Sequence, residues 1–334
     1  MKQDIVCATE NGGFSDNHAI AYCLLSYLCA YFRHYYPIQF ITAFLNCAAN
    51  DDDIRNGTSY ATKKGISVTM PKFGLSRREY FYDEEKHVIA KGLSSVKYMS
   101  DTVADELYTM SKERTYTHFV DLLRDIDEKT SLNTRQLDIL IRLDFFSDFG
   151  NQRELLAITE MFYDTFNRGN AKKIARSKIE GTPLEEIVAK YAVGETKTGG
   201  FSKFYTLLDV NSILAEAESA ILSCGMEDLP DTTKVRAFAE IMGYAGYVSG
   251  KEEDRRKLYV SDVMPVKRKK DGKQFGYSIV TKSIGSGIDA RFTVFNAVYN
   301  SDPIKKGDII WCSSYTREGQ YFTLTGFRKL QDSA

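Results

Sequence analysis

The chain has 334 residues, 27% of them charged, and a formal net charge of -1. Because this length exceeds the size at which a single hydrophobic core usually keeps growing, we expect two or three domains. The six cysteines form no CxxC pair and no Cys/His cluster, which argues against a zinc site, and the N-terminus has no charged-then-apolar leader. These features predict a cytoplasmic protein with reduced thiols.

The near-neutral net charge hides an uneven distribution. From Arg255 to the C-terminus there are fifteen Lys and Arg residues against seven Asp and Glu residues, a balance of +8. The residues before Arg255 therefore carry -9, which together with +8 gives the total of -1. A basic tail on an acidic body indicates a polyanionic partner for the tail.

The first expected element is a helix that begins near Asp16, whose side chain can cap it, and that stops at Pro37. No side chain from Ala19 to Phe32 is charged, and this run falls short of the roughly 20 residues that cross a bilayer. We therefore expect a core helix and no contact with a membrane. Its aromatic side chains, Tyr27 and Phe32 among them, should be largely buried.

The order of residues in this helix and the next is distinctive. It comprises Asn17-His18-Ala19, Ala21-Tyr22, Ser26-Tyr27, Tyr36-Pro37, Phe40 and Leu45-Asn46. This order resembles a signature of the C-family, the bacterial replicative DNA polymerase III alpha subunits, with His18, Tyr22 and Tyr27 at signature positions. Taken alone, His18 would only cap or pack at the start of a helix.

The resemblance also implies where catalysis would lie. The family's catalytic aspartates belong to a palm region that would precede Met1, so we expect this chain alone not to polymerise DNA. The run Asp51-Asp52-Asp53 should not replace them, because three consecutive carboxylates cannot converge on one ion. We expect no catalytic residue, metal site or cofactor in this chain, and Mg²⁺ only where a palm domain is supplied elsewhere.

Residues 54–92 are expected to form a helix, a strand and a small hairpin. Gly65 stops the helix, residues 66–70 alternate, and residues 80–82 face residues 87–89 across a polar turn. This arrangement is similar to that of the family, in which a short strand and a hairpin lead into the DNA-binding region.

In residues 92–150 the resemblance implies tandem helix-hairpin-helix elements, whose hairpin N–H groups and following helix N-terminus hold a DNA phosphate. The first hairpin, residues 96–101, has Tyr98 and Ser100 where the family has glycines, and Asp101 adds a negative charge. We expect the scaffold to persist while its contact with DNA is weakened.

The second helix-hairpin-helix element matches the family better. Residues 131–137 open a helix with Asn133 as its cap, and residues 145–150 match the family's closing pattern. The resemblance implies that Arg135 contacts a phosphate and that Lys129 assists it. The alternative is a solvated helix face with an ordinary N-cap.

Residues 151–248 are expected to be mostly helical. Thr182-Pro183-Leu184-Glu185 combines the cap, the proline and the early acid of a helix start. Family members often carry a peptide here that binds the sliding clamp, but residues 200–204 begin with the wrong residue, so clamp binding stays open. Residues 240–250 resemble the family's linker helix.

From Leu258 onward the hydrophobic period changes to two. Lys270-Asp271-Gly272-Lys273 is a strong hairpin signal between the first two of five expected strands. The five strands are expected at residues 258–267, 276–280, 291–295, 308–312 and 321–325. This pattern predicts an OB-fold, which the family also carries at this point.

OB-folds bind single strands through basic loops and stacking aromatic side chains. A basic cluster with two neighbouring aromatic residues lies at the first hairpin: Lys267, Arg268, Lys269, Lys270, Lys273, Phe275 and Tyr277. Two alternatives remain, because a Lys-rich hairpin also protects strand edges and because alternation places Phe275 and Tyr277 on one face, where they would suit a core.

The sequence thus predicts an α+β multidomain chain, mostly α-helical with helix-hairpin-helix elements in its first two thirds and ending in a five-stranded OB-fold-like barrel. The expected domains are a fingers-like region with a small hairpin, a helix-hairpin-helix region, a helical connector and the barrel, at residues 1–91, 92–166, 167–254 and 255–330.

The predicted function is that of a DNA-binding C-terminal portion of a replicative polymerase alpha subunit, without its palm. Its partners would be duplex DNA at the helix-hairpin-helix region, single-stranded DNA at the barrel, and polymerase or replisome proteins. The alternatives are a stand-alone, non-catalytic accessory protein and a protein-docking scaffold derived from the family.

Overall fold

The structure, a computed structural model, describes residues 16–195 and 201–330. It divides into two compact units. Unit 1 extends to Met70 and includes Ser76–Gly92, whereas unit 2 comprises Pro71–Leu75 and everything from Leu93 onward. In the described part of the chain no helix is both long enough and apolar enough to cross a membrane.

Unit 1 combines helices with a small three-stranded sheet. Its elements are α2 (Asp16–Tyr35), α3 (Pro37–Asn46), α4 (Asp51–Lys63), β1 (Ser67–Thr69), β2 (Phe81–Asp83) and β3 (Val88–Ala90). The central strand β3 pairs in parallel with β1 and antiparallel with β2, where Tyr82 lies opposite Ile89. The expected hairpin is therefore present, but each of its strands begins one residue later than the sequence indicated.

Helix α2 is exposed along its described side chains, which contradicts the expected core helix. Tyr27 is 65% exposed and Phe32 is 48% exposed. The buried cluster of unit 1 instead comes from α3, α4 and the sheet, and consists of Ile41, Leu45, Ala61, Ile66, Tyr80 and Ile89. The absence of charged residues makes burial of a helix possible, but burial also requires another part of the protein to pack against it, and the core of unit 1 forms without α2.

The aromatic side chains of α2 pack on one another instead. The Tyr31 ring lies 6.4 Å from that of Tyr27 and 4.7 Å from that of Tyr35, centroid to centroid. Tyr22 is also exposed. The side chains of Asp16 and His18 lie outside the described residues, so the expected roles of these two residues stay predictions.

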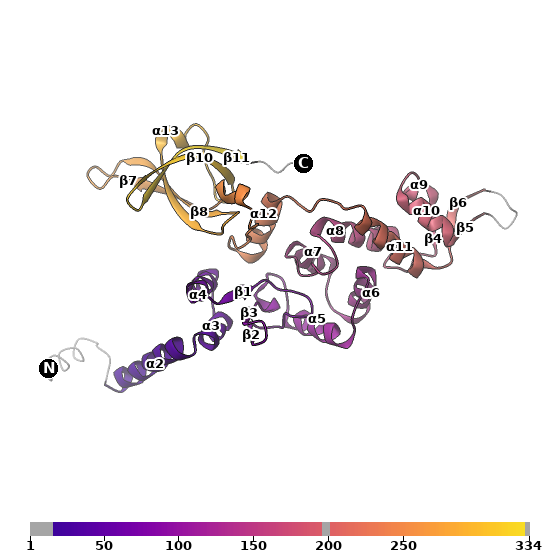
Figure 1. The fold of residues 1–334 in the computed structure, drawn as a ribbon, viewed down its shortest axis with the longest axis horizontal. Helices are drawn as coiled ribbons and strands as arrows, with labels where there is room; N and C mark the ends of the chain where they lie inside the picture. Colours follow the sequence, from indigo (N-terminus) through magenta and orange to yellow (C-terminus); the bar gives the residue numbers. More distant parts are fainter. Residues whose placement is uncertain (1–15, 196–200, 331–334) are drawn as a thin grey trace. The chain divides into compact units, whose positions relative to one another are not determined.

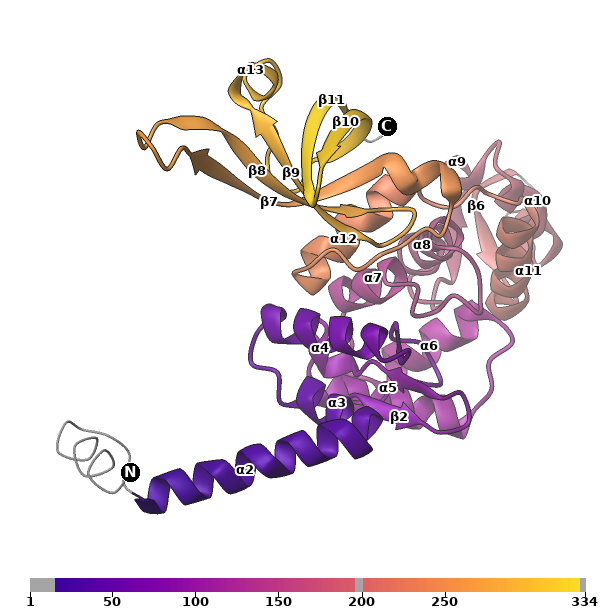
Figure 2. The same cartoon turned by 60° about the vertical axis from the view of Figure 1, so that its left-hand side comes forward.

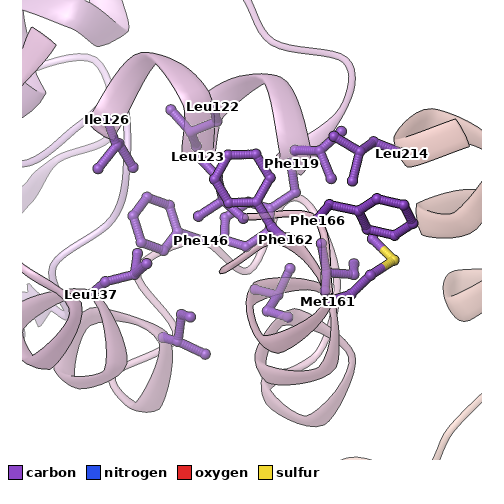
Figure 3. Packing of buried hydrophobic residues seen from close by; sticks show 14 of the residues in the cluster. Phe119, Leu122, Leu123, Ile126, Leu137, Phe146, Met161, Phe162, Phe166 and Leu214 are labelled. Atoms are coloured by element: carbon purple, nitrogen blue, oxygen red, sulfur yellow. The ribbon is translucent and has the colours of Figure 1, made fainter. Parts of the chain in front are cut away.

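The helical part of unit 2 has one large core. Its elements up to the first strand are η1 (Leu93–Ser95), α5 (Asp101–Glu113), α6 (Phe119–Lys129), α7 (Thr134–Arg142), α8 (Gln152–Glu160) and the single π-turn η2 (Met161–Thr165). Figure 3 shows side chains from several of these elements and from the turn after α7 converging, among them Phe119, Phe146 and Phe162. These three side chains are fully buried.

The region after η2 is less helical than expected. It contains β4 (Lys173–Ala175), α9 (Arg176–Ile179), α10 (Pro183–Lys190), β5 (Ala192–Glu195), β6 (Phe201–Leu207), α11 (Val210–Ser223) and α12 (Asp231–Met242). The three strands form an antiparallel sheet with β6 in the centre. Helices α9 to α12 agree with the expectation that this region is mostly helical, but the sheet was not expected, because β4 and β5, with three and four residues, are too short to show a period of two.

The C-terminal part of unit 2 is a closed five-stranded barrel (Figure 1). It comprises η3 (Glu252–Arg256), β7 (Lys257–Lys267), β8 (Gln274–Ser283), β9 (Asp289–Phe295), α13 (Asn296–Tyr299), β10 (Ile309–Glu318) and β11 (Tyr321–Leu330). The ladder runs in the order β10-β11-β9-β8-β7 and closes between β7 and β10. This confirms the predicted fold class, with helices first and a barrel near the C-terminus.

Candidate nucleic-acid interface

The first hairpin connects η1 to α5. The Met99 N–H donates to the Val96 carbonyl at 3.1 Å, and Ser100 caps α5 by accepting from the Val103 N–H at 3.3 Å. Between them, Tyr98 has a φ of 68°, in the left-handed region that favours glycine. The hairpin thus keeps a backbone shape suited to glycine although a tyrosine stands there.

The second hairpin connects α6 to α7 through a reciprocal cap. Asn133 Oδ1 accepts from the Gln136 N–H at 3.0 Å, and Gln136 Oε1 accepts from the Asn133 N–H at 3.0 Å. This capping box confirms Asn133 as the start of the helix. The loop before it is bound by Glu106 of α5, whose Oε2 accepts from the Ser131 N–H at 2.7 Å and from its hydroxyl at 2.8 Å.

The two hairpins lie side by side. Gln136 Nε2 donates to the Tyr98 carbonyl at 2.7 Å. The Arg135 guanidinium carbon lies 4.0 Å from the centroid of the Tyr98 ring, a cation–π contact. Arg135 and Tyr98 are both exposed, so this stacked pair forms part of the surface where the hairpins meet.

Lys129 is placed differently from Arg135. Its ammonium lies 3.0 Å from the carboxylate of Asp125, which also accepts from the Tyr116 hydroxyl at 2.7 Å and from Arg114 at 3.2 Å. Burial raises the pKa of Asp125, but the hydrogen bonds from Tyr116 and Lys129 outweigh it and hold the pKa below its usual range. Part of the Lys129 charge is therefore neutralised within the protein.

The basic cluster of the barrel lies on the hairpin between β7 and β8, which Figure 2 shows projecting beyond the other strands. The hairpin is closed by the Arg268 N–H, which donates to the Lys273 carbonyl at 2.9 Å, and by the Gly272 N–H, which donates to the Arg268 carbonyl at 2.9 Å. All five members are exposed: Lys267, Arg268, Lys269, Lys270 and Lys273. None of them takes part in an ion pair found among the described residues.

The two aromatic residues predicted beside this cluster are half-buried. The Tyr277 ring stacks on the Tyr299 ring of α13, with centroids 3.6 Å apart and planes 17° apart. The Phe275 ring lies 6.0 Å from that of Phe295. Alternation places both on the same side of β8 as the buried Ile279. Both rings therefore already have an aromatic partner within the barrel, and their role in stacking on bases stays a prediction.

The sequence analysis missed a second aromatic group on the barrel. Tyr315, Phe322 and Phe292 form a cluster whose ring centroids are each 5.9 Å apart, and the Arg317 guanidinium lies 5.3 Å from the Phe322 ring. Tyr315 is exposed, and Tyr321 at the β10–β11 turn is 72% exposed. This group could have been predicted from the sequence, because Tyr315, Arg317 and Tyr321 flank a Glu-Gly-Gln turn that joins two strands. Such a turn places the aromatic and basic side chains on one hairpin.

The structure offers no described cluster suited to a metal ion. Across residues 16–195 and 201–330, no three His, Cys, Asp or Glu side chains gather for ligation. In the acidic run, Asp52 pairs with Arg55 at 2.8 Å, and the Asp53 N–H donates to the Asn50 side chain at 2.9 Å. These residues start helix α4, so their order reflects capping and the helix dipole.

Comparison with known proteins matches both hairpins to one motif. The family model of the helix-hairpin-helix motif matches residues 65–156, which include the Tyr98 hairpin and the cap at Asn133. This confirms the helix-hairpin-helix elements expected from the sequence.

Longer relatives were found among characterised proteins. The chain is 26% identical to the DNA polymerase III subunit alpha of Ureaplasma parvum serovar 3 over 47% of its own length and 16% of the relative's. It is 30% identical to that of Thermus aquaticus over 55% of its length and 16% of the relative's. It is 25% identical to that of Treponema pallidum over 75% of its length and 19% of the relative's. The chain thus spans less than a fifth of each relative, and it is related to one part of the bacterial DNA polymerase III alpha subunits.

Proposed function

We propose that this chain binds DNA and acts in replication as the counterpart of one part of a DNA polymerase III alpha subunit. The observation that carries the proposal is the helix-hairpin-helix match, within which Arg135 lies exposed where the two hairpins meet. Helix-hairpin-helix elements bind the phosphate backbone and therefore hold DNA without reading its sequence.

Two surfaces divide the binding in this proposal. Arg135, with a smaller contribution from the partly neutralised Lys129, would contact duplex DNA. The basic cluster on the β7–β8 hairpin would follow the backbone of a single strand, because it holds five exposed cations without an ion pair among the described residues. The exposed Tyr315 and Tyr321 suit base stacking better than the half-buried Phe275 and Tyr277.

We propose no catalytic role in nucleotide transfer for the described residues. Transfer of a nucleotide needs convergent carboxylates that hold Mg²⁺, and we expect those only in a palm domain on another part of a polymerase or on a partner. Purified chain supplied with primed template, nucleotides and Mg²⁺ should therefore leave the primer unextended. Template-dependent extension would contradict this part of the proposal.

If the two surfaces bind different forms of DNA, substitutions on each surface should reduce the affinity for one form more than for the other. Arg135→Ala should weaken binding to duplex DNA more than to a single strand. A quadruple variant, with Lys267, Arg268, Lys269 and Lys270 changed to Ser, should do the reverse. Affinities can be measured by fluorescence anisotropy with labelled 20-nucleotide probes of both kinds.

The control for these variants removes one exposed cation elsewhere. Lys203→Ser lies on the sheet strand β6, outside both surfaces, and should change neither affinity. If Arg135→Ala and the quadruple variant both leave the two affinities at the control value, the proposed function is wrong.

A second candidate function is docking onto a protein, which the exposed helix α2 favours. Ten large apolar side chains on this helix and at its junction with α3 are exposed to water. They are Ile20, Tyr22, Leu24, Leu25, Tyr27, Leu28, Tyr31, Phe32, Tyr35 and Tyr36. A surface of this kind is typical of a binding site. We assign as its occupant a polypeptide that contains the part of DNA polymerase III alpha which this chain does not span, because the chain covers at most 19% of the relatives named above.

Binding between purified proteins tests this second candidate. The chain should form a complex with a DNA polymerase III alpha subunit from the same cell, and Tyr27→Ser together with Leu24→Ser should abolish it. Phe204→Ser, which changes an exposed aromatic residue on β6, is the matched control. Self-association that depends on α2, detected by sedimentation without the partner, would instead identify a second copy of this chain as the occupant.

A further inference from the structure

The groups that would bind a phosphate at the helix-hairpin-helix surface already have partners within the protein. Arg135 is the cation that the proposed function assigns to duplex DNA, and its guanidinium is held 4.0 Å from the centroid of the Tyr98 ring. The ring is 60% exposed, so it lies on the surface that DNA would approach. A guanidinium stacked on an aromatic face must leave or share that contact when it turns towards a phosphate.

Tyr98 holds this position at a conformational cost. A φ of 68° is uncommon for a residue with a side chain and unfavourable for a bulky one. The surrounding hydrogen bonds fix the conformation, since Gln136 Nε2 donates to the Tyr98 carbonyl at 2.7 Å and the Met99 N–H donates to Val96. Strain of this kind persists where the neighbouring structure imposes it, and it is frequent at binding sites.

The loop before Asn133 is occupied in the same way. Glu106 Oε2 accepts from both the N–H and the hydroxyl of Ser131, at 2.7 and 2.8 Å. The Asn133 N–H donates to Gln136 Oε1, and the Leu132 N–H donates to Thr130 Oγ1 at 3.3 Å. A carboxylate on a loop amide takes the place that an anionic oxygen of DNA would take, and its charge repels phosphate.

We propose that two groups of the protein compete with DNA phosphate, the Tyr98 ring for the Arg135 guanidinium and the Glu106 carboxylate for the Ser131 N–H, which makes this helix-hairpin-helix surface a weakened duplex-binding site. The inference rests on the proposed function and adds to it the two residues that set the affinity. Tyr98 acts through Arg135, whereas Glu106 acts through the loop amide of Ser131 and through its own charge.

Substitutions that keep the left-handed backbone test Tyr98 without unfolding the hairpin. Asn and Gly tolerate a positive φ, so Tyr98→Asn and Tyr98→Gly remove the ring and retain the turn. Each should raise the affinity for a 20-base-pair duplex about two- to fivefold, the factor that corresponds to losing a competing cation–π contact at an exposed site. Tyr98→Phe keeps the ring and should bind the duplex like the parent protein.

A double variant shows whether the effect passes through Arg135. In the Arg135→Ala background, Tyr98→Asn should give no further rise, because no guanidinium remains to be released. Glu106→Gln retains an oxygen that can accept from Ser131 but loses the charge, so it should raise duplex affinity most at low salt.

The outcomes separate this inference from the proposed function. If Arg135→Ala leaves duplex affinity at the parent value, the duplex assignment itself fails. If Arg135→Ala weakens binding but Tyr98→Asn and Tyr98→Gly leave it unchanged or weaken it further, only the inference is overturned, since the ring would then be neutral or would contact DNA itself. An equal rise in the presence and absence of Arg135 would also overturn it.

Discussion

Phe119 illustrates how single residues hold the helical part of unit 2 together. Its ring is fully buried and lies 5.4 Å from that of Phe146, while its N–H donates to the buried carboxylate of Glu218 at 2.8 Å. Phe119→Ala should destabilise the protein by about 3 to 5 kcal/mol, because it leaves a cavity in a packed core. Urea unfolding measures this change.

The matched control is Tyr321→Ala, which removes a ring that is 72% exposed. This variant should remain within about 0.5 kcal/mol of the parent protein. Equal stability losses in the two variants would show that burial does not govern the stability of these sites.

The carboxyl group of Asp125 should make the stability of the folded protein depend on pH. Its pKa is lowered because the hydrogen bonds from Tyr116 and Lys129 outweigh the opposing effect of burial. A carboxyl whose folded pKa lies below its unfolded value of about 3.9 contributes stability above that pH and loses it as the pH falls through the folded value. Asp125→Asn should therefore lower stability at pH 7, and its deficit should shrink as the pH falls below about 4.

Unfolding experiments at several pH values check this expectation. Asp52→Asn is a suitable control, because the ion pair of Asp52 with Arg55, at 2.8 Å, is exposed. A deficit for Asp125→Asn that stays constant between pH 7 and pH 3 would contradict the assigned role of the carboxylate.

At the scale of elements, helix α2 is the clearest departure from expectation. Because the described side chains of α2 face water, Tyr27→Ala and Phe32→Ala should each change the melting temperature little. Leu45→Ala, on the neighbouring helix α3, should lower it clearly, since Leu45 is buried in the core of unit 1. Thermal melts that show comparable losses for all three variants would mean that α2 is covered.

The elements that the sequence located best are those whose side chains alternate over many residues. The strands β7 and β8 have ten or eleven residues, and Asp271-Gly272 fixes the turn between them, so the barrel was predictable. Helix α7 was predictable from Asn133, whose cap has a local sequence signature. The sheet of β4, β5 and β6 was not, because β4 and β5 have only three and four residues and β4 pairs with a strand that begins only at Phe201, after two helices and β5.

The candidate site shows the same limit at the level of contacts. The sequence identified Arg135 and the basic hairpin, since charge and motif are local properties. It did not reveal that Arg135 stacks on Tyr98 or that Tyr277 stacks on Tyr299, because both contacts join residues more than twenty positions apart. Whether a side chain is available to DNA therefore depends on tertiary packing.

At the scale of the whole molecule, charge and architecture coincide. The balance of +8 from Arg255 onward begins with the last two residues of η3 and continues through the barrel, whereas the first three residues of η3, all acidic, belong to the preceding part that carries -9. A protein divided in this way should direct a polyanion towards its barrel and away from its acidic part. Binding to DNA should accordingly depend strongly on ionic strength.

The salt dependence of binding to a single-stranded 20-mer tests the central claim most directly. Each phosphate contact should contribute a slope of about -0.7 to log K against log salt, so the quadruple change of Lys267, Arg268, Lys269 and Lys270 should flatten the slope by up to about 2.8. We predict a steep slope for the parent protein, and for the quadruple variant a flatter one together with weaker binding. An unchanged affinity and an unchanged slope in the variant would contradict the claim, because the charges would then serve only to keep an exposed hairpin soluble.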